Sequence, residues 1–79
     1  MFYYTYVLKS QKNGEMYIGW TVNLKVRLSK HNEGLVKATK SYIPYNLVYF
    51  EACKSKSKAI LREKTLKTGF GRKFLAKRI

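Results

Sequence analysis

The chain has 79 residues and carries 17 Lys and Arg against four acidic residues, all of them Glu, for a formal net charge of +13. A chain of this length makes one small domain and leaves no room for a second folded unit. It is 46% hydrophobic and contains seven Tyr, four Phe and one Trp. That apolar content is enough for a core and excludes a disordered basic tail.

Cysteine content and targeting segments narrow the cellular context. Cys53 is the single cysteine, so it cannot form an internal disulfide, and no Cys/His cluster suits zinc. Neither a secretory signal nor an apolar run long enough to span a bilayer is present. We therefore expect one soluble domain over residues 1–79 in a reducing cytoplasm.

The excess of basic residues is the strongest compositional signal. Self-repulsion at this charge destabilises the compact state, and a polyanionic partner offsets it. Nucleic acid is the leading candidate partner. Two alternatives remain open: a basic surface without a partner, and an anionic membrane, which the spread of Lys along the chain disfavours.

The first expected elements are two strands. Residues 2–9 and 16–21 are rich in β-branched and aromatic side chains. Between them, Asn13-Gly14 is typical of a two-residue hairpin turn because both positions accept a positive φ. With these residues at the centre of the turn, Leu8 lies opposite Gly19 and Tyr6 lies opposite Thr21.

This pairing places Tyr6 and Tyr17 on one face of the hairpin. Gly19 supplies no side chain to that face and leaves room for a ligand or another backbone. A one-residue bulge would move the two phenols to opposite faces. A tyrosine-rich hairpin is also consistent with a stable hairpin and nothing more.

A helix, a loop and a third strand follow the hairpin. Asn23 is a typical N-cap for a helix over residues 24–32, which ends near Gly34. A basic, polar loop runs to Pro44, and residues 46–52 form a strand.

Two further helices complete the chain. Ser55 or Ser57 caps the first of them, which runs to about Lys67. Gly69 and Gly71 separate it from a short basic helix over residues 72–78. The order is β-β-α-loop-β-α-α. It predicts an α+β fold in which a small three-stranded, mostly antiparallel sheet is flanked by helices.

Two polar residues lie beside the apolar stripe of the first helix. At about 100° per residue, Arg27 and His31 border the positions of Leu24 and Leu28. A guanidinium at this border needs a partner or an anion, and its five donors suit a phosphate. His31 alone is consistent with a structural histidine, so it is the pair of Arg27 and His31 that indicates a phosphate-binding site.

Glu63 is the only acid of the second helix. Measured from Ala59, it falls at about 40°, inside the apolar arc that also holds Ile60 and Leu66. A buried ionised carboxylate must be paired or bind a metal. An ion pair between Glu63 and Arg27 and a Mg²⁺ site therefore both remain open.

Together these residues favour hydrolysis of a phosphodiester. Two phenols, a guanidinium, an imidazole and a lone carboxylate supply a base or water-orienting group, a clamp for phosphate oxygens and a ligand for one cation. Free Tyr titrates at about 10, so a tyrosine base needs help from a metal or from basic surroundings.

The motifs resemble those of the GIY-YIG endonuclease superfamily. The segments 4-YTYVLK-9 and 17-YIG-19 are similar to its two name-giving motifs, and 21-TVNLKVRLSKH-31 resembles its helix with Arg and His. The loop and strand over residues 34–51 are similar too, and 59-AILREKTLK-67 resembles the helix with the metal-binding Glu. The likeness covers nearly the whole chain and points to small stand-alone, single-domain members that are similar to the nuclease domain of the excision-repair endonuclease.

The resemblance implies a divalent-metal-dependent endonuclease with one Mg²⁺ or Mn²⁺ ion per site, acting on DNA in repair or in processing of branched or damaged DNA. The implied roles are Tyr6 as general base or water-orienting group, Tyr17 as its phenolic neighbour, Arg27 as phosphate clamp, His31 as accessory acid or orienting group, Glu63 as metal ligand and Gly19 as a structural residue of the site. Nucleic-acid contacts are expected from Lys37, Lys40, Arg62, Lys67, Arg72 and Lys73.

The chain departs from the family pattern at two places. Tyr4 stands where the first motif opens with Gly, and residues 67–79 contain no clear counterpart of an Asn that some members carry beyond the metal helix. We expect no appended DNA-recognition module. This implies poor or unselective cleavage by the chain alone, or a protein partner that supplies specificity.

Two other function classes remain open. A non-catalytic nucleic-acid-binding module would keep the fold and the charge, with Trp20, Tyr42 and Tyr45 either stacking on bases or packing in the core. A partner-binding accessory domain would carry its charge incidentally. Glu63 separates these classes from an enzyme, because a carboxylate repels phosphate unless a cation lies between them.

Overall fold

The backbone forms three strands and three α-helices joined by short connections. The computed structural model describes all of residues 1–79. In chain order the elements are β1 (Tyr3–Ser10), β2 (Met16–Thr21), α1 (Leu24–Asn32), a 3₁₀ helix (Lys40–Tyr42), β3 (Tyr45–Cys53), α2 (Lys56–Leu66) and α3 (Gly69–Ala76). The predicted α+β class and the predicted order of strands and α-helices are confirmed, and the 3₁₀ helix was not predicted.

β1 is the central strand of the sheet. The strand order is β2-β1-β3, and both pairs are antiparallel. Four successive residues of β1, Thr5, Tyr6, Val7 and Leu8, are each at most 2% exposed, because a central strand is covered on both faces. Side chains alternate along a strand, so Tyr6 and Leu8 point to one face and Thr5 and Val7 to the other.

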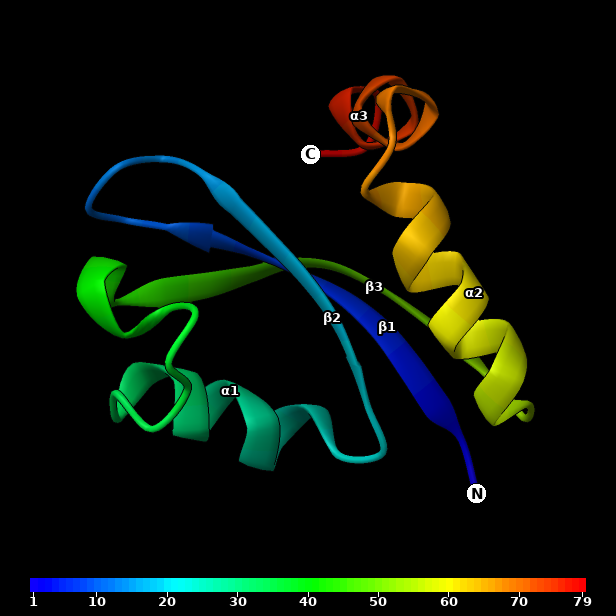
Figure 1. Cartoon of the computed structure of the whole chain (residues 1–79), viewed down its shortest axis with the longest axis horizontal. Coiled ribbons are helices and arrows are strands. Elements are labelled where there is room, and N and C mark those ends of the chain that lie inside the picture. Colours follow the sequence, from blue (N-terminus) through cyan, green and yellow to red (C-terminus); the bar gives the residue numbers. More distant parts are fainter.

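The helices cover the two faces of the sheet separately (Figure 1). α1 packs on the face of Tyr6 through Leu24 and Leu28. α2 and α3 cover the opposite face, where Leu66 and Leu75 bury Val7. Side chains of α1 and α2 can therefore meet only around an edge of the sheet and not through it.

The turn of the β1–β2 hairpin is wider than predicted. The N–H of Ser10 donates to the carbonyl of Glu15 at 2.9 Å, so the loop comprises residues 11–14, and only Gly14 has a positive φ, of 75°. The predicted two-residue turn is wrong. The longer loop is favoured because the hydroxyl oxygen of Ser10 accepts hydrogen bonds from the backbone N–H groups of Lys12 and Asn13.

The wider turn shifts the predicted strand register by two residues. Tyr6 lies opposite Gly19, and Leu8 lies opposite Tyr17. A shift of two residues keeps every side chain on its face, whereas a shift of one would have exchanged the faces. The predicted common face of Tyr6 and Tyr17 is therefore confirmed.

The predicted boundaries of α1 and the start of α2 are confirmed by their caps. The side-chain oxygen of Asn23 accepts the N–H of Val26 at 3.1 Å, and Ser55, not Ser57, caps α2 by accepting the N–H of Lys58 at 3.3 Å. No helix of the chain has both the length and the apolar character that crossing a bilayer requires.

α3 begins earlier than predicted. Gly69 and Gly71 lie in its first turn, and the hydroxyl of Thr68 caps the helix by accepting the N–H of Gly71 at 3.4 Å. A Cβ at Gly71 would lie 2.0 Å from the carbonyl oxygen of Leu66. Glycine here permits close packing of α3 on the end of α2, and the sequence pattern was misinterpreted because glycine usually interrupts helices.

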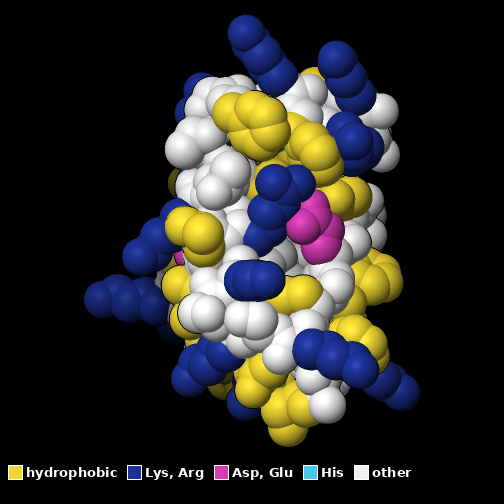
Figure 2. Space-filling model, turned by 90° about the vertical axis from the view of Figure 1, so that its right-hand side faces the viewer, with side chains coloured by type: hydrophobic (Ala, Val, Ile, Leu, Met, Phe, Trp, Pro, Cys, Tyr) yellow, Lys and Arg dark blue, Asp and Glu magenta, His cyan; other side chains and the backbone are white.

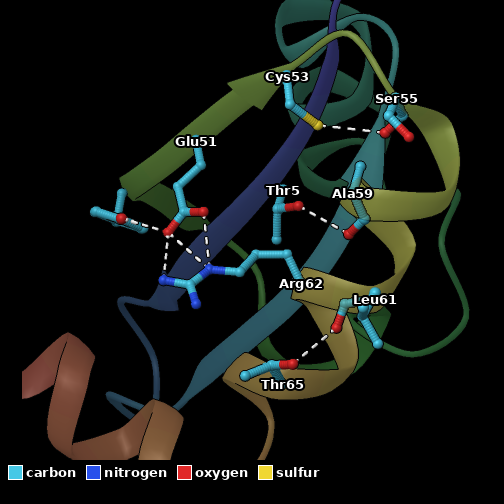
Figure 3. Close-up of polar contacts among 9 residues, drawn as sticks. Thr5, Glu51, Cys53, Ser55, Ala59, Leu61, Arg62 and Thr65 are labelled. Atoms are coloured by element: carbon cyan, nitrogen blue, oxygen red, sulfur yellow. Dashed lines mark hydrogen bonds and ion pairs between the residues drawn. The ribbon is translucent and has the colours of Figure 1, made fainter.

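Polar contacts fix the rotation of α2 against the sheet (Figure 3). The guanidinium of Arg62 donates to both carboxylate oxygens of Glu51 on β3 at 2.9 to 3.1 Å. The hydroxyl of Thr5 on β1 donates to the carbonyl of Ala59 at 2.9 Å. Because Glu63 follows Arg62 directly, these contacts also determine the direction in which Glu63 points.

The glycine pair of α3 yields a prediction for stability. We expect Gly71→Ala to lower the free energy of unfolding by about 1–3 kcal/mol, because the new methyl group overpacks a contact with backbone. Gly69→Ala is the matched control, since nothing lies within 4 Å of its Cβ position, and it should raise stability by about 0.4–1 kcal/mol. Urea unfolding measures both changes. Equal effects at the two positions would contradict this account of the α2–α3 contact.

Candidate active site

Tyr6 lies at the centre of a polar cluster. Its side chain comes from β1, and its hydroxyl oxygen lies 2.9 Å from Nε2 of His31. The same oxygen accepts a hydrogen bond from Nε of Arg27 at 3.3 Å. Two side chains one turn apart on α1 thus reach a single phenol oxygen, and the residues predicted at the border of the apolar stripe are brought together.

Gly19 makes room for this phenol. A Cβ at Gly19 would lie 2.6 Å from the hydroxyl oxygen of Tyr6 and 3.2 Å from a ring carbon of Tyr17. The backbone of Gly19 has no positive φ, so the requirement for glycine is one of space. The open floor predicted at Gly19 is occupied by the Tyr6 side chain itself.

His31 is fully buried among tyrosine rings. It is 0% exposed, and its ring centroid lies 5.8 Å from that of Tyr6, 5.0 Å from that of Tyr17 and 6.4 Å from that of Tyr45. Both ring nitrogens nevertheless have polar partners. Tyr45, for which base stacking was one alternative, is 6% exposed and belongs to the core.

Thr39 is a residue of the cluster that the sequence did not reveal. Its hydroxyl oxygen lies 2.7 Å from Nδ1 of His31, and the residue is 0% exposed. The hydroxyl of Thr39 donates to the carbonyl of Val36 at 3.4 Å, so we assign the Nδ1 proton to His31. Nε2 then carries a lone pair and accepts the Tyr6 hydroxyl proton. The only sequence signal is a threonine in a loop, and loop geometry is not encoded by periodicity.

The pKa shifts agree with this assignment of protons. Burial lowers the pKa of His31 to about 4, and the charge of Arg27 acts in the same direction. Burial also raises the pKa of Tyr6, although the hydrogen bond from Arg27 opposes the shift. The hydrogen bond to Tyr6 in turn raises the pKa of Arg27. Near neutral pH the imidazole and the phenol are uncharged and the guanidinium is charged.

Tyr17 is the more exposed phenol of the pair. It is half-buried on β2, its ring centroid lies 6.5 Å from that of Tyr6, and its hydroxyl makes no well-aligned hydrogen bond within the chain. Tyr17 also contributes to raising the pKa of Arg27, which places its hydroxyl beside the guanidinium. The structure thus brings both phenols together with Arg27 and His31, as predicted.

Glu63 lies near this cluster but does not contact it. Its side chain is 18% exposed, and its Oε2 lies 2.8 Å from Nζ of Lys67, whose side chain is 52% exposed. Glu63 makes a minor contribution to the raised pKa of Tyr6, so the carboxylate is within electrostatic range of the phenol. The alternative of an ion pair with Arg27 is wrong, because Arg27 is engaged by Tyr6 and Glu63 by Lys67.

The donor set that the chain offers to a metal is one carboxylate. No group of three or more His, Cys, Asp or Glu side chains converges anywhere in the chain. This does not fit zinc, which takes three or four protein ligands. Mg²⁺ keeps several waters and needs one or two carboxylates together with phosphate oxygens, so Glu63 fits a hard cation once the flexible Lys67 turns away.

The basic residues expected to contact nucleic acid do not gather on one face. Lys37 and Lys40 are exposed in the segment between α1 and β3, whereas Arg72 and Lys73 are exposed on α3 across the sheet. Arg62 and Lys67 are held in ion pairs. Figure 2 shows Lys and Arg side chains scattered over the side of the molecule that carries α2, with acidic atoms confined to small areas among them. We do not retain Arg62 as a phosphate contact, because its Nε and Nη2 already donate to the carboxylate of Glu51.

The fold and the cluster together define a small nuclease domain. A family model described as the GIY-YIG catalytic domain matches residues 2–76, and the chain belongs to the GIY-YIG family, as its motifs predicted. Since this is a nuclease domain family, the substrate class is nucleic acid. GIY-YIG nucleases generally depend on a divalent metal.

Within this family the chain is similar to UPF0213 proteins. It is 42% identical over 67 residues to one from Staphylococcus haemolyticus, covering 84% of this chain and 80% of that protein. It is 43% identical over 65 residues to one from Clostridium perfringens, covering 81% and 69%. The solution NMR structure of a UPF0213 protein from Bacillus halodurans matches with a TM-score of 0.59 and 30% identity, covering 98% of this chain and 84% of that one. The expected likeness to small GIY-YIG proteins is confirmed.

The environment of His31 predicts an unusual titration. His31 is the only histidine, so its ring signals can be followed by NMR without ambiguity, and we expect a midpoint of about 4. The unfolded chain, with a pKa of about 6.5, binds the proton more tightly, so the folded state loses about 3 kcal/mol of stability as the pH falls from about 6.5 to about 4. Urea unfolding across this range measures the loss, and His31→Asn should flatten it. A midpoint near that of free histidine would contradict the buried cluster.

Proposed function

We propose that this protein is a divalent-metal-dependent endonuclease that hydrolyses phosphodiester bonds in DNA during repair or processing of branched or damaged DNA. The observation that carries the proposal is the phenol of Tyr6 held between Nε of Arg27 and Nε2 of His31. Membership of a nuclease family supports the reaction class. The net charge of +13 supports a polyanionic substrate, because phosphate contacts of Lys and Arg give sequence-independent affinity.

The proton path follows from the hydrogen bonds of Tyr6. Its oxygen retains one lone pair besides the one that Arg27 uses, and its proton is directed at His31. The attacking water gives a proton to Tyr6 while Tyr6 passes its own proton to Nε2 of His31. The water oxygen bonds to phosphorus, the bond from phosphorus to the leaving oxygen breaks, and the leaving oxygen keeps the electron pair and takes up a proton from solvent. This path needs no free tyrosinate, which burial disfavours. The imidazolium is transient, because burial lowers the pKa of His31 to about 4 and the ring gives the proton back through Tyr6 once the bond has broken.

Arg27 and Tyr17 are the groups that reach the substrate. Tyr6 is 2% exposed, whereas Arg27 and Tyr17 are partly exposed, so direct contact with phosphate falls to them. Arg27 hydrogen-bonds Tyr6 through Nε alone, which leaves its two terminal nitrogens to donate to phosphate oxygens. A fixed guanidinium there offsets the charge that develops on those oxygens.

Glu63 is the residue that would hold the cation. When bound, a Mg²⁺ or Mn²⁺ ion supplies positive charge to the leaving oxygen. Lys67 must release the Glu63 carboxylate for this, and its half-exposed side chain allows the movement. The released ammonium group is then free to bind phosphate.

Substitution at Glu63 and Arg27 tests the enzyme assignment. We expect Glu63→Gln and Arg27→Ala to abolish nicking dependent on Mg²⁺ or Mn²⁺, while affinity for DNA stays within about threefold of wild type, because most affinity comes from dispersed phosphate contacts. The assay is a cleavage screen over flaps, junctions, nicked duplexes and single strands of DNA and RNA. Undiminished cleavage by Glu63→Gln would refute the metal role.

The same screen separates the enzyme from the non-catalytic alternative. A wild-type protein that binds these substrates in a salt-dependent manner and cuts none of them with either ion would favour a binding module. Folding of Glu63→Gln is checked by the titration of His31, which should keep its midpoint of about 4. Folding of Arg27→Ala is checked by urea unfolding, because the charge of Arg27 itself contributes to the low pKa of His31.

Thr39 yields a second prediction for catalysis. Thr39→Val removes the acceptor of the Nδ1 proton and frees the ring to adopt the other tautomer, so we expect kcat to fall by about 10- to 100-fold. Thr39→Ser keeps the hydroxyl and should stay within about threefold of wild type. Nitrogen chemical shifts of His31 report the tautomer in both variants. A wild-type tautomer and pH profile in Thr39→Val would show that Thr39 has a packing role only.

A further inference from the structure

A groove opens beside Tyr17 and takes no part in the steps above. Its volume is about 520 Å³, and it lies between the first half of β2 and the junction of α2 with α3. Pockets that bind small ligands have volumes of about 300–1,000 Å³, so the groove can hold one nucleotide but not a duplex. The groove is thus a candidate for part of a single strand.

The groove borders the candidate active site at two points. Tyr17 lines it and also lies beside Arg27 and His31. Lys67 lines it from the other side and pairs with Glu63. A strand in the groove therefore runs from the candidate metal ligand to the phenol pair around the edge of β2.

The wall formed by β2 offers free backbone groups. β2 is an edge strand, so alternate N–H and C=O groups along it have no strand partner. No loop or helix bonds to the backbone of residues 16–20 either. Met16, which is 44% exposed, and Ile18 line the same wall and give it apolar surface.

The opposite wall is cationic. Arg72 lines it from the first turn of α3, and its guanidinium makes no hydrogen bond or ion pair within the chain. Lys67 adds a second positive charge, and Glu15 at the hairpin end is the only acid that lines the groove. An apolar floor beside the unpartnered guanidinium of Arg72 suits an unpaired base followed by its phosphate.

We propose that this groove is the binding subsite for the unpaired nucleotide next to the scissile phosphate, with the base against Met16 and Ile18 and the flanking phosphate on Arg72. The proposal rests on the nuclease function proposed above. A net charge of +13 favours a nucleic acid over the alternative occupant of a strand edge, an extended peptide. The subsite makes a single-stranded segment beside the cut a requirement for tight binding.

A charge reversal with a matched control tests the phosphate contact. Arg72→Glu should raise KM for single-stranded or flap DNA about tenfold or more and leave kcat within about twofold, because the contact is equal in ground and transition states. Lys77→Glu makes the same change in charge at the other end of α3, outside the groove, and should change KM by about threefold or less. Equal effects of the two variants would reduce Arg72 to a general surface charge and overturn this part of the subsite.

Binding without cleavage tests the base contact. A thymidine tetranucleotide is added to the wild-type protein in EDTA, and methyl signals are followed by NMR. The signals of Met16 and Ile18 should shift, whereas those of Leu35, which is 69% exposed and lies outside the groove, should not. Shifts at Met16 and Ile18 with an unstructured acidic hexapeptide but none with the tetranucleotide would assign the groove to a peptide and overturn the proposal.

The two experiments separate failure of the subsite from failure of the nuclease function. If the protein cuts DNA while the tetranucleotide leaves Met16 and Ile18 unchanged, the subsite is wrong and the nuclease function stands. If no substrate is cut but the tetranucleotide shifts these signals and Arg72→Glu abolishes the shifts, the nuclease function is wrong and the groove remains a nucleotide site.

Discussion

The structure of the site depends on one buried hydroxyl group. The oxygen of Tyr6 is shared between Arg27 and His31, and it lies over Gly19, where any side chain would displace it. An unpaired hydroxyl in this position would cost about 1–3 kcal/mol, so the strand, the helix and the hairpin hold one another in place through it. Thr39 extends the constraint to the loop after α1 by holding the far nitrogen of His31. The geometry of the candidate site is therefore also a part of the core.

The placement of helices on opposite faces explains why the candidate site lies at an edge. Arg27 and His31 come from α1 on one face of the sheet, and Glu63 comes from α2 on the other. They approach one another only around β2, which has no neighbouring strand on its outer side. A site at such an edge stays open to a long substrate, whereas a site within either helical layer would be closed by the sheet. The groove beside Tyr17 follows the same edge.

Few of the basic side chains take part in ion pairs that stabilise the fold. Only two ion pairs form, Glu51 with Arg62 and Glu63 with Lys67, although the chain carries 17 Lys and Arg. The first pair is bidentate and fixes α2 against β3, so it serves the fold. The second is a single contact with a half-exposed lysine, which a cation and a phosphate can replace together. The remaining basic side chains have no acidic partner and stay available to a polyanion.

Local patterns in the chain were enough to specify the elements, the faces and the family. Caps and periodicity gave α1 its bounds, and alternation placed Tyr6 with Tyr17 even though the turn was misassigned, because a shift of two residues preserves the face. The start of α3 and the contact of Thr39 with His31 emerged only from packing in three dimensions. Both depend on atoms that lie close in space and that no local pattern specifies: the Leu66 carbonyl against Gly71, and a loop folded beneath His31. The pair of Glu63 with Lys67 differs, because i, i+4 spacing on a helix brings these two side chains together whatever the tertiary packing. Periodicity reports which way a side chain points, whereas its partner is set by how the layers pack.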